Sequence, residues 1–199
     1  MKKKIIVKIS EGLGNQLFMY AHSFALSKKF NLEFYIDPYS GYFKKNVYKY
    51  MLSNFNISSK IAPSKWIFSN HYRHLMKKIN FKFDYFKKNK SFLFEAKKLD
   101  KSTSFIPLNL NNTTNEFYVD GNFETEKYFI DYKKELYDEF SLTNLNFSNN
   151  QYFELIKNNN VVSICVRQNR YSERLNHKNF RESKYKSDIF VKDTIKYIY

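Results

Sequence analysis

Runs of aliphatic residues alternate with segments of helical periodicity at the start of the chain. Lys4–Ile9 is a nearly continuous aliphatic run, which predicts a buried strand of a parallel sheet. From Asn15 onward apolar residues recur at i, i+4, i+7 and i+8, which predicts a helix with an Asn15 N-cap that ends near Lys29. Leu32–Ile36 predicts the next strand. This order indicates a βαβ unit with a right-handed crossover, and therefore an α/β fold.

Similar signals recur in the second half of the chain. Glu116–Gly121 predicts a short strand that ends in a turn, and Thr125–Phe140 predicts a helix with aromatic residues at helical spacing. Val161–Val166 predicts another buried strand, and Asp188 predicts the cap of a last helix.

The region between these strands has a weaker pattern. Tyr39–Ile57 predicts one or two short helices under the sheet, whereas Pro63–Phe94 mixes aromatic residues and lysine without a clear period. Asn158–Asn160 predicts an interdomain hinge. We therefore expect a Rossmann-like lobe over residues 1–157 and the start of a second lobe over residues 161–199. That start holds one strand, one loop and one helix, far less than the ~100 residues of a typical domain.

Composition narrows the class of protein. The 199 residues are 43% hydrophobic and 20% aromatic, which is ample for a packed core and argues against wholesale disorder. The net charge of +15 has two interpretations. One is attraction to polyanions such as nucleic acid, an anionic membrane surface or phosphorylated small molecules. The other is a coding bias toward Lys, Asn, Ile, Phe and Tyr, which the spread of the basic residues along the chain favours.

Cysteine, histidine and the N-terminus restrict the chemistry and the location. Cys165 is the one cysteine, which excludes an internal disulfide and a cysteine-only zinc site. The four histidines lack metal-ligand spacing, so no metal is expected. The apolar run behind the basic start is broken by Lys8, and no run approaches the ~20 residues of a membrane helix. We therefore expect a cytoplasmic protein, with peripheral contact at the inner face of the membrane left open.

A glycine turn joins the first strand to the first helix. Glycine at Gly12 and Gly14 permits positive φ and the close approach of a ligand to the backbone. Free amides at the helix start favour an anionic or hydroxyl-rich group. Leu17 stands where a dinucleotide fingerprint needs a small residue, which argues against an NAD site. The spacing also suits a tight turn without a ligand.

A second glycine motif follows the predicted strand at Glu116–Gly121. Its early glutamates, Glu124 and Glu126, complement the dipole of the predicted helix, and Thr125 or Asn122 would cap that helix. Capping alone accounts for both glutamates.

An arginine motif follows the predicted strand Val161–Val166. Arg167 at that place can bind a phosphate bidentately in the crevice between two domains, and Arg170 adds a second charge. The alternative is an arginine that covers the sheet edge and pairs with a carboxylate.

Together the three motifs resemble those of the bacterial α-1,2-fucosyltransferases, glycosyltransferase family 11. That family opens with a strand and Gly-Gly-Leu-Gly-Asn-Gln-Leu-Phe-Gln-Tyr-Ala, which Glu11–Ala21 matches except at Glu11 and Met19. Its middle block, Gly-Tyr-Phe-Gln-Ser-Glu-Lys-Tyr-Phe, is similar to Gly121–Phe129. Its arginine motif, His-x-Arg-Arg-x-Asp-Tyr, corresponds to Cys165–Tyr171.

The resemblance implies a two-lobed GT-B architecture. It implies inverting transfer of L-fucose from the nucleotide sugar GDP-fucose to O2 of a galactoside glycan, in the synthesis of surface glycans such as lipopolysaccharide. Arg167, with Arg170 nearby, is expected to bind the donor's diphosphate and to stabilise the leaving GDP without a metal. No further cofactor is implied, and the residues do not identify a catalytic base. The resemblance assigns substrate binding to five matching residues: Gly12, Gly14, Asn15, Gln16 and Glu126.

The arginine motif departs from the family pattern, because Cys165, Gln168 and Arg170 stand where the family has His, Arg and Asp. The expected incompleteness of the second lobe leaves open both an active transferase and a truncated, inactive one. Two other classes stay open: a non-catalytic remnant that binds glycans or a membrane, and a basic nucleic-acid binder. Aromatic residues at core periodicity and the lack of a nucleic-acid motif disfavour nucleic acid as a partner.

Overall fold

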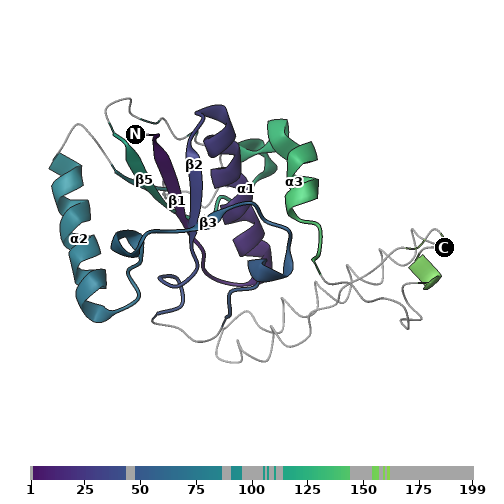
Figure 1. Ribbon diagram of the computed structural model, residues 1–199, viewed down its shortest axis with the longest axis horizontal. Coiled ribbons are helices and arrows are strands. Elements are labelled where there is room, and N and C mark those ends of the chain that lie inside the picture. The colour runs from purple at the N-terminus through teal and green to yellow at the C-terminus, as the bar shows by residue number, and fades with distance from the viewer. Residues whose placement is uncertain are drawn as a thin grey trace, which may run out of the picture. The chain divides into compact units, whose positions relative to one another are not determined.

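The computed structural model describes residues 2–43, 48–86, 91–95, 105, 107, 110, 114–143, 154–156, 159 and 161 (Figure 1). The chain divides into two units, Met1–Leu145 and Asn146–Tyr199. Among the described residues, every strand lies in the first unit, and residues 154–156 of the second are helical. Apart from Val161, the predicted strand Val161–Val166 lies outside the described residues. Arg167, Arg170 and the last helix also lie outside them and stay predictions.

A parallel sheet forms the centre of the first unit. Its five strands lie in the order β3-β2-β1-β5-β4. They are β1 (Lys4–Lys8), β2 (Glu33–Asp37), β3 (Lys60–Ile61), β4 (Phe92–Phe94) and β5 (Glu116–Asp120). The strands predicted at Lys4–Ile9, Leu32–Ile36 and Glu116–Gly121 are confirmed to within one residue at each end. The α/β class and a Rossmann-like parallel sheet are confirmed with them.

Helix α1 (Leu13–Lys29) follows β1 and ends where the periodicity predicts. Its predicted start is wrong. The N-cap is Gly12, not Asn15, and it makes no side-chain capping hydrogen bond. The amide of Gln16 donates to the Gly12 carbonyl at 3.1 Å, so the first helical turn closes before Asn15 could act as a cap.

The single helix predicted over Thr125–Phe140 is also wrong. The segment forms two 3₁₀ turns, η3 (Glu126–Tyr128) and η4 (Ile130–Tyr132), before α3 (Lys133–Glu139). Phe129 interrupts the helical path with φ of −143°, and its ring packs against Phe18 of α1 with centroids 5.9 Å apart. Neither Thr125 nor Asn122 caps a helix with its side chain here, because no α-helix begins at this point.

The weakly patterned middle of the chain contains further short elements. The predicted short helix within Tyr39–Ile57 is present as η1 (Leu52–Asn54). The stretch left unassigned contains η2 (Ser64–Trp66), α2 (His71–Phe86) and β4. Sequence periodicity therefore missed one of the two long helices.

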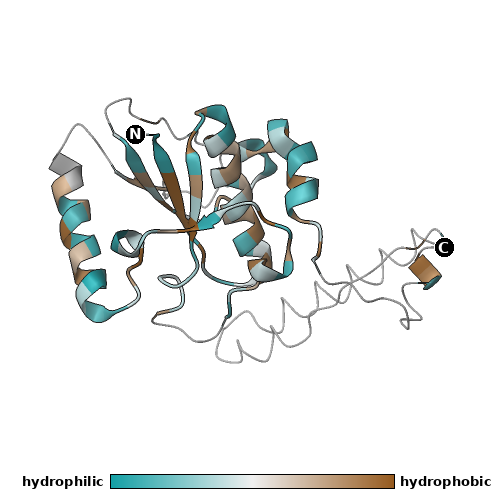
Figure 2. Cartoon of the chain, in the orientation of Figure 1, coloured by the Kyte–Doolittle hydropathy of each residue, from teal (hydrophilic) through white to brown (hydrophobic). Residues whose placement is uncertain are grey.

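The two faces of the sheet have separate apolar layers. Ile5, Val7 and Ile9 point to the face that α1 covers. Ile6 and Tyr118 point to the other face, where Trp66, Phe68 and Phe92 pack on them. Figure 2 shows the apolar colour concentrated in β1 at the middle of the sheet. Alternation along β1 thus divides one aliphatic run between two layers.

Candidate functional site

The two glycine motifs lie beside one another at the carboxyl edge of the sheet. One follows β1 and the other follows β5, and these strands are parallel neighbours with Val7 opposite Val119. The sheet extends from β1 to β2 and β3 on one side and to β5 and β4 on the other. In open α/β sheets ligands bind outside the carboxyl ends of the strands where the order reverses in this way. The structure therefore brings Gly12, Gly14 and the segment after Asp120 to one expected ligand position.

The backbone of the first motif is open. A Cβ added at Gly14 would have no atom within 4 Å, and one added at Gly12 would meet only ring carbons of Tyr48, at 3.6 and 3.7 Å. Glycine would permit positive φ here, but neither Gly12 nor Gly14 adopts it. The left-handed residue is Glu11, with φ of 63°. The fold itself does not require glycine at 12 or 14, and their lack of a side chain exposes the start of α1.

Gln16 holds this turn in place. Its side chain is fully buried and donates from Nε2 to the carbonyls of Glu11 at 2.9 Å and Lys49 at 2.8 Å. Its Oε1 accepts from the Met51 amide at 2.9 Å. These bonds join the start of α1 to a loop more than thirty residues away in the sequence. Gln16 is thus a fixed positioning group, whereas Asn15 is partly exposed beside it.

The second motif is held by Glu95, which sequence reasoning missed. Its carboxylate accepts from the amides of Asn122 at 2.8 Å and Phe123 at 3.1 Å. A Cβ at Gly121 would lie 2.5 Å from the Glu95 Cβ, so glycine is needed there for close packing. Phe123 has φ of 53°, an uncommon conformation for an aromatic residue. No local pattern marks Glu95, because its partners lie 27 and 28 positions further along the chain.

The glutamates of this motif lie on the surface. Glu124 and Glu126 are both exposed, and Glu126 is the first residue of η3. The helix dipole that was expected to account for them does not arise at this point, because α3 begins only at Lys133. The side chain of Glu126 is therefore accessible to a ligand.

A largely buried polar cluster that no local pattern predicts joins the sheet to α2. Its members are Lys8, Asp37, Lys77, Tyr118 and Asp120. The Asp120 carboxylate pairs with Lys77 Nζ of α2 at 2.8 Å and with Lys8 Nζ. Asp37 accepts from the Tyr118 hydroxyl at 2.8 Å. Burial alone would raise the pKa of Asp120, but the two lysines lower it overall. Burial lowers the pKa of Lys77 and raises that of Tyr118 well above the usual value.

His22 is the second unusual buried group. It is 1% exposed, neither ring nitrogen has a hydrogen-bond partner, and burial lowers its pKa to about 3. Its ring stacks on Phe123 with centroids 3.8 Å apart and meets the Tyr128 ring edge-on. Among the described residues no group of three His, Cys, Asp or Glu side chains is placed to hold a metal ion.

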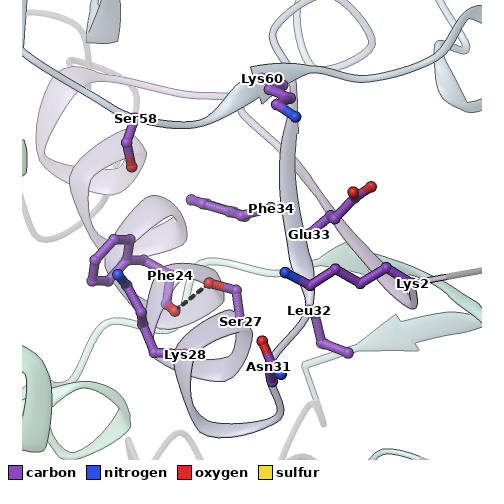
Figure 3. A pocket seen from close by; sticks show the side chains of 10 residues that line it. All are labelled: Lys2, Phe24, Ser27, Lys28, Asn31, Leu32, Glu33, Phe34, Ser58 and Lys60. Carbon is purple, nitrogen blue, oxygen red and sulfur yellow. Dashed lines mark hydrogen bonds between the residues drawn. The ribbon is translucent and has the colours of Figure 1, made fainter.

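A hollow of about 380 Å³ lies at the opposite, amino edge of the sheet (Figure 3). It is lined by Leu32 just before β2, Glu33 at the start of β2 and Lys28 in the last turn of α1. Lys28 lies over the Phe24 ring, 5.0 Å from its centroid. A lysine in the last turn also complements the helix dipole, which explains its position without a ligand. The hollow is separate from the motifs at the carboxyl edge.

In the part of the chain that the structure describes, no helix has the length and apolar composition needed to cross a bilayer. No family model, curated protein or solved structure matches this chain. The carboxyl edge with its two motifs is therefore the candidate site on geometric grounds.

Proposed function

We propose that the chain acts as a glycosyltransferase that transfers L-fucose from GDP-fucose to O2 of a galactoside, with inversion, and that residues 1–157 form the first lobe of a GT-B architecture. One observation carries the proposal: Glu11–Ala21 and Gly121–Phe129 converge at the switch point of a parallel sheet. These are the two blocks that resemble the fucosyltransferase family. Because the two blocks lie side by side, both can contact the same ligand.

In the proposed acceptor site, some of the described residues would contact the sugar and one would support the turn that receives it. The open backbone at Gly12 and Gly14 admits a sugar ring against the start of α1. Asn15 and Glu126 offer side chains that can hydrogen-bond sugar hydroxyls. Gln16, which was expected to bind substrate, would instead hold the turn in the shape that receives it.

The donor would be bound by the arginine motif. Arg167 and Arg170 would neutralise the diphosphate of GDP-fucose as the glycosidic bond breaks and GDP leaves. Because the arginines supply this positive charge, the proposal assigns no step to a metal.

Calorimetry with GDP-fucose tests the donor half of the proposal. We expect the wild-type chain to bind and Arg167→Ala to lose roughly tenfold or more in affinity, the usual cost of removing a charge-assisted contact. Lys134→Ala, which removes an exposed charge on α3, is the matched control and should bind as the wild type does. A folded wild-type chain that does not bind GDP-fucose would contradict the proposal. Salt-sensitive RNA binding that Arg167→Ala leaves unchanged would also contradict it.

Release of GDP in the presence of galactosides tests the acceptor half. Gly14→Ala and Glu126→Gln should lower the rate, while Glu124→Gln, two residues from Glu126 and equally on the surface, should not. Gly14→Ala is informative because the added methyl group meets no atom of the protein, so an effect on the rate reports on the ligand. If all three variants released GDP at the wild-type rate, the motifs would not bind the acceptor.

A further inference from the structure

Helix α2 exposes a continuous apolar stripe. Tyr72, Leu75, Ile79 and Phe83 are spaced by three or four residues and therefore share one face of the helix. Their side chains are 72%, 55%, 36% and 61% exposed. Large apolar side chains gathered on one exposed face mark an interaction surface more often than chance exposure does.

The face of α2 opposite the stripe is the one that docks on the protein, where Phe81 packs on Phe94 of β4 with ring centroids 4.6 Å apart. Lys77 is the buried residue of that face; it pairs with Asp120 at 2.8 Å and lies over the Tyr118 ring. Arg73 Nη1 donates to the carbonyls of Ser64 at 2.8 Å and Ile67 at 3.2 Å. These contacts fix the rotation of the helix about its axis. The stripe therefore points away from the sheet, and α2 itself lies on the face of the sheet opposite α1 (Figure 1).

Basic residues border the stripe. Lys78 and Lys82 are exposed and lie along one edge of it. Asp84 is the one acidic residue of α2, and the whole chain carries a net charge of +15. An aromatic and aliphatic face bordered by lysine is typical of helices that lie in the interface of an anionic bilayer.

We propose that α2 binds the surface of an anionic membrane, with the stripe at the boundary between headgroups and acyl chains and Lys78 and Lys82 at the lipid phosphates. Charge complementarity selects this occupant. A second copy of the chain would bring the same lysines and the same net charge of +15 to the contact, and like charges repel across an interface. The proposal is independent of the transferase chemistry.

Vesicle flotation with the full chain tests this surface. We expect binding to vesicles of phosphatidylcholine with equimolar phosphatidylglycerol and little binding to phosphatidylcholine alone. The double variant Tyr72→Ser/Phe83→Ser should lower the partition coefficient roughly tenfold or more, because the apolar contact is lost. Lys78→Gln/Lys82→Gln should weaken binding and reduce its salt dependence.

Matched controls come from α3. Tyr137 is 69% exposed, so Tyr137→Ser removes a comparable ring from another helix, and Lys133→Gln/Lys134→Gln removes two exposed charges. These controls should bind as the wild type does, and circular dichroism should show every variant folded. A wild-type chain that does not float with anionic vesicles would overturn the proposal, as would an equal loss in the controls. A dimer that Tyr72→Ser/Phe83→Ser converts to a monomer would assign the stripe to a second copy instead.

Discussion

The two long helices lie on opposite faces of one sheet and are held there in opposite ways. Helix α1 buries a continuous series of residues from Met19 to Ser27, because the sheet covers one side of it and α3 with the neighbouring loops covers the other. Tyr20 of α1, for instance, packs on Phe34 of β2 and on Phe140 after α3. Within residues 71–83 of α2 the only buried residue is Lys77.

This difference shows what an apolar pattern does and does not predict. The periodicity of a helix says that an apolar face exists, and burial then depends on what the tertiary structure brings against that face. α1 has partners on nearly all sides. α2 meets the sheet through the ion pair of Lys77 with Asp120 and the ring contact of Phe81 with Phe94 of β4, and the opposite, apolar face stays outside.

The largest expected effect comes from the apolar packing of α1. Phe24→Ala should lower the free energy of unfolding by about 4 kcal/mol. The Phe24 ring is 2% exposed and packs against Tyr20 and Phe34, so its removal leaves a cavity. Leu75→Ala in the exposed stripe of α2 should change the free energy of unfolding by at most about 0.5 kcal/mol. Urea unfolding at pH 7 measures both. Similar losses in the two variants would mean that α2 buries its stripe in solution.

Acid should lower the free energy of unfolding through His22 of α1. Its folded pKa of about 3 lies below the ordinary 6.5, so as the pH falls the unfolded chain takes up a proton before the folded one does. Stability is therefore lost between pH 6.5 and 3, by about 1.4 kcal/mol per pH unit over most of that range. His22→Phe should remove this part of the pH dependence. It should also remove the free-energy cost of burying two ring nitrogens without hydrogen-bond partners. Parallel stability curves for wild type and variant over pH 4–6 would show that His22 is not the cause.

Removing Lys77 should detach α2 and leave α1 intact. We expect Lys77→Met to cost about 2 kcal/mol at pH 7, less than a fully broken buried pair because Lys8 still faces Asp120. Hydrogen exchange should show lost protection in α2 alone. Lys78→Met, at the next and exposed position, is the control.

The same variant has a defined pH signature. Lys77 and Lys8 outweigh burial and lower the pKa of Asp120, so the stability that this carboxylate contributes is present above its ordinary pKa of about 4 and is lost as the pH falls below it. The difference between wild type and Lys77→Met should therefore narrow below about pH 4. A gap that stays constant down to pH 2 would assign the loss to packing of the lysine stem.

The smallest effects concern how the two helices begin. α2 has a side-chain cap, since Asn70 Oδ1 accepts from the Arg73 amide at 2.8 Å, and Asn70→Ala should cost about 1 kcal/mol. α1 has no such cap and follows Glu11 at φ of 63°. Glu11→Gly should therefore stabilise the fold by about 0.5–1 kcal/mol, because glycine adopts that conformation without strain. Thermal unfolding compares the two, and a destabilising Glu11→Gly would contradict the strain argument.

Local patterns predicted the elements whose neighbours are close in sequence. The strands β1, β2 and β5 and the end of α1 follow directly from aliphatic runs and periodicity. The single helix expected over Thr125–Phe140 failed because packing of Phe129 on α1 interrupts it. α2 was missed because its docking face carries Arg73 and Lys77, which read as solvent-facing residues in a sequence.

In the candidate site, too, some features can be predicted from local sequence and others depend on tertiary contacts. The glycine motifs are visible in the sequence, and a parallel sheet already implies that both lie at a carboxyl edge. Their adjacency depends on the strand order, which places β5 beside β1. Glu95 and the ion pair of Lys77 with Asp120 join residues 27 and 43 positions apart, so no local spacing announces them.

The α/β fold, its first βαβ unit and the two glycine motifs after strands can be predicted from the sequence, because aliphatic runs and periodicity act over short distances along the chain. Three outcomes arise from long-range contacts instead: the motifs lie side by side, Gln16 and Glu95 hold them in place, and α2 turns its apolar face outward. Those outcomes depend on hydrogen bonds and ion pairs between segments far apart in the sequence, whose geometry arises only when the sheet has formed.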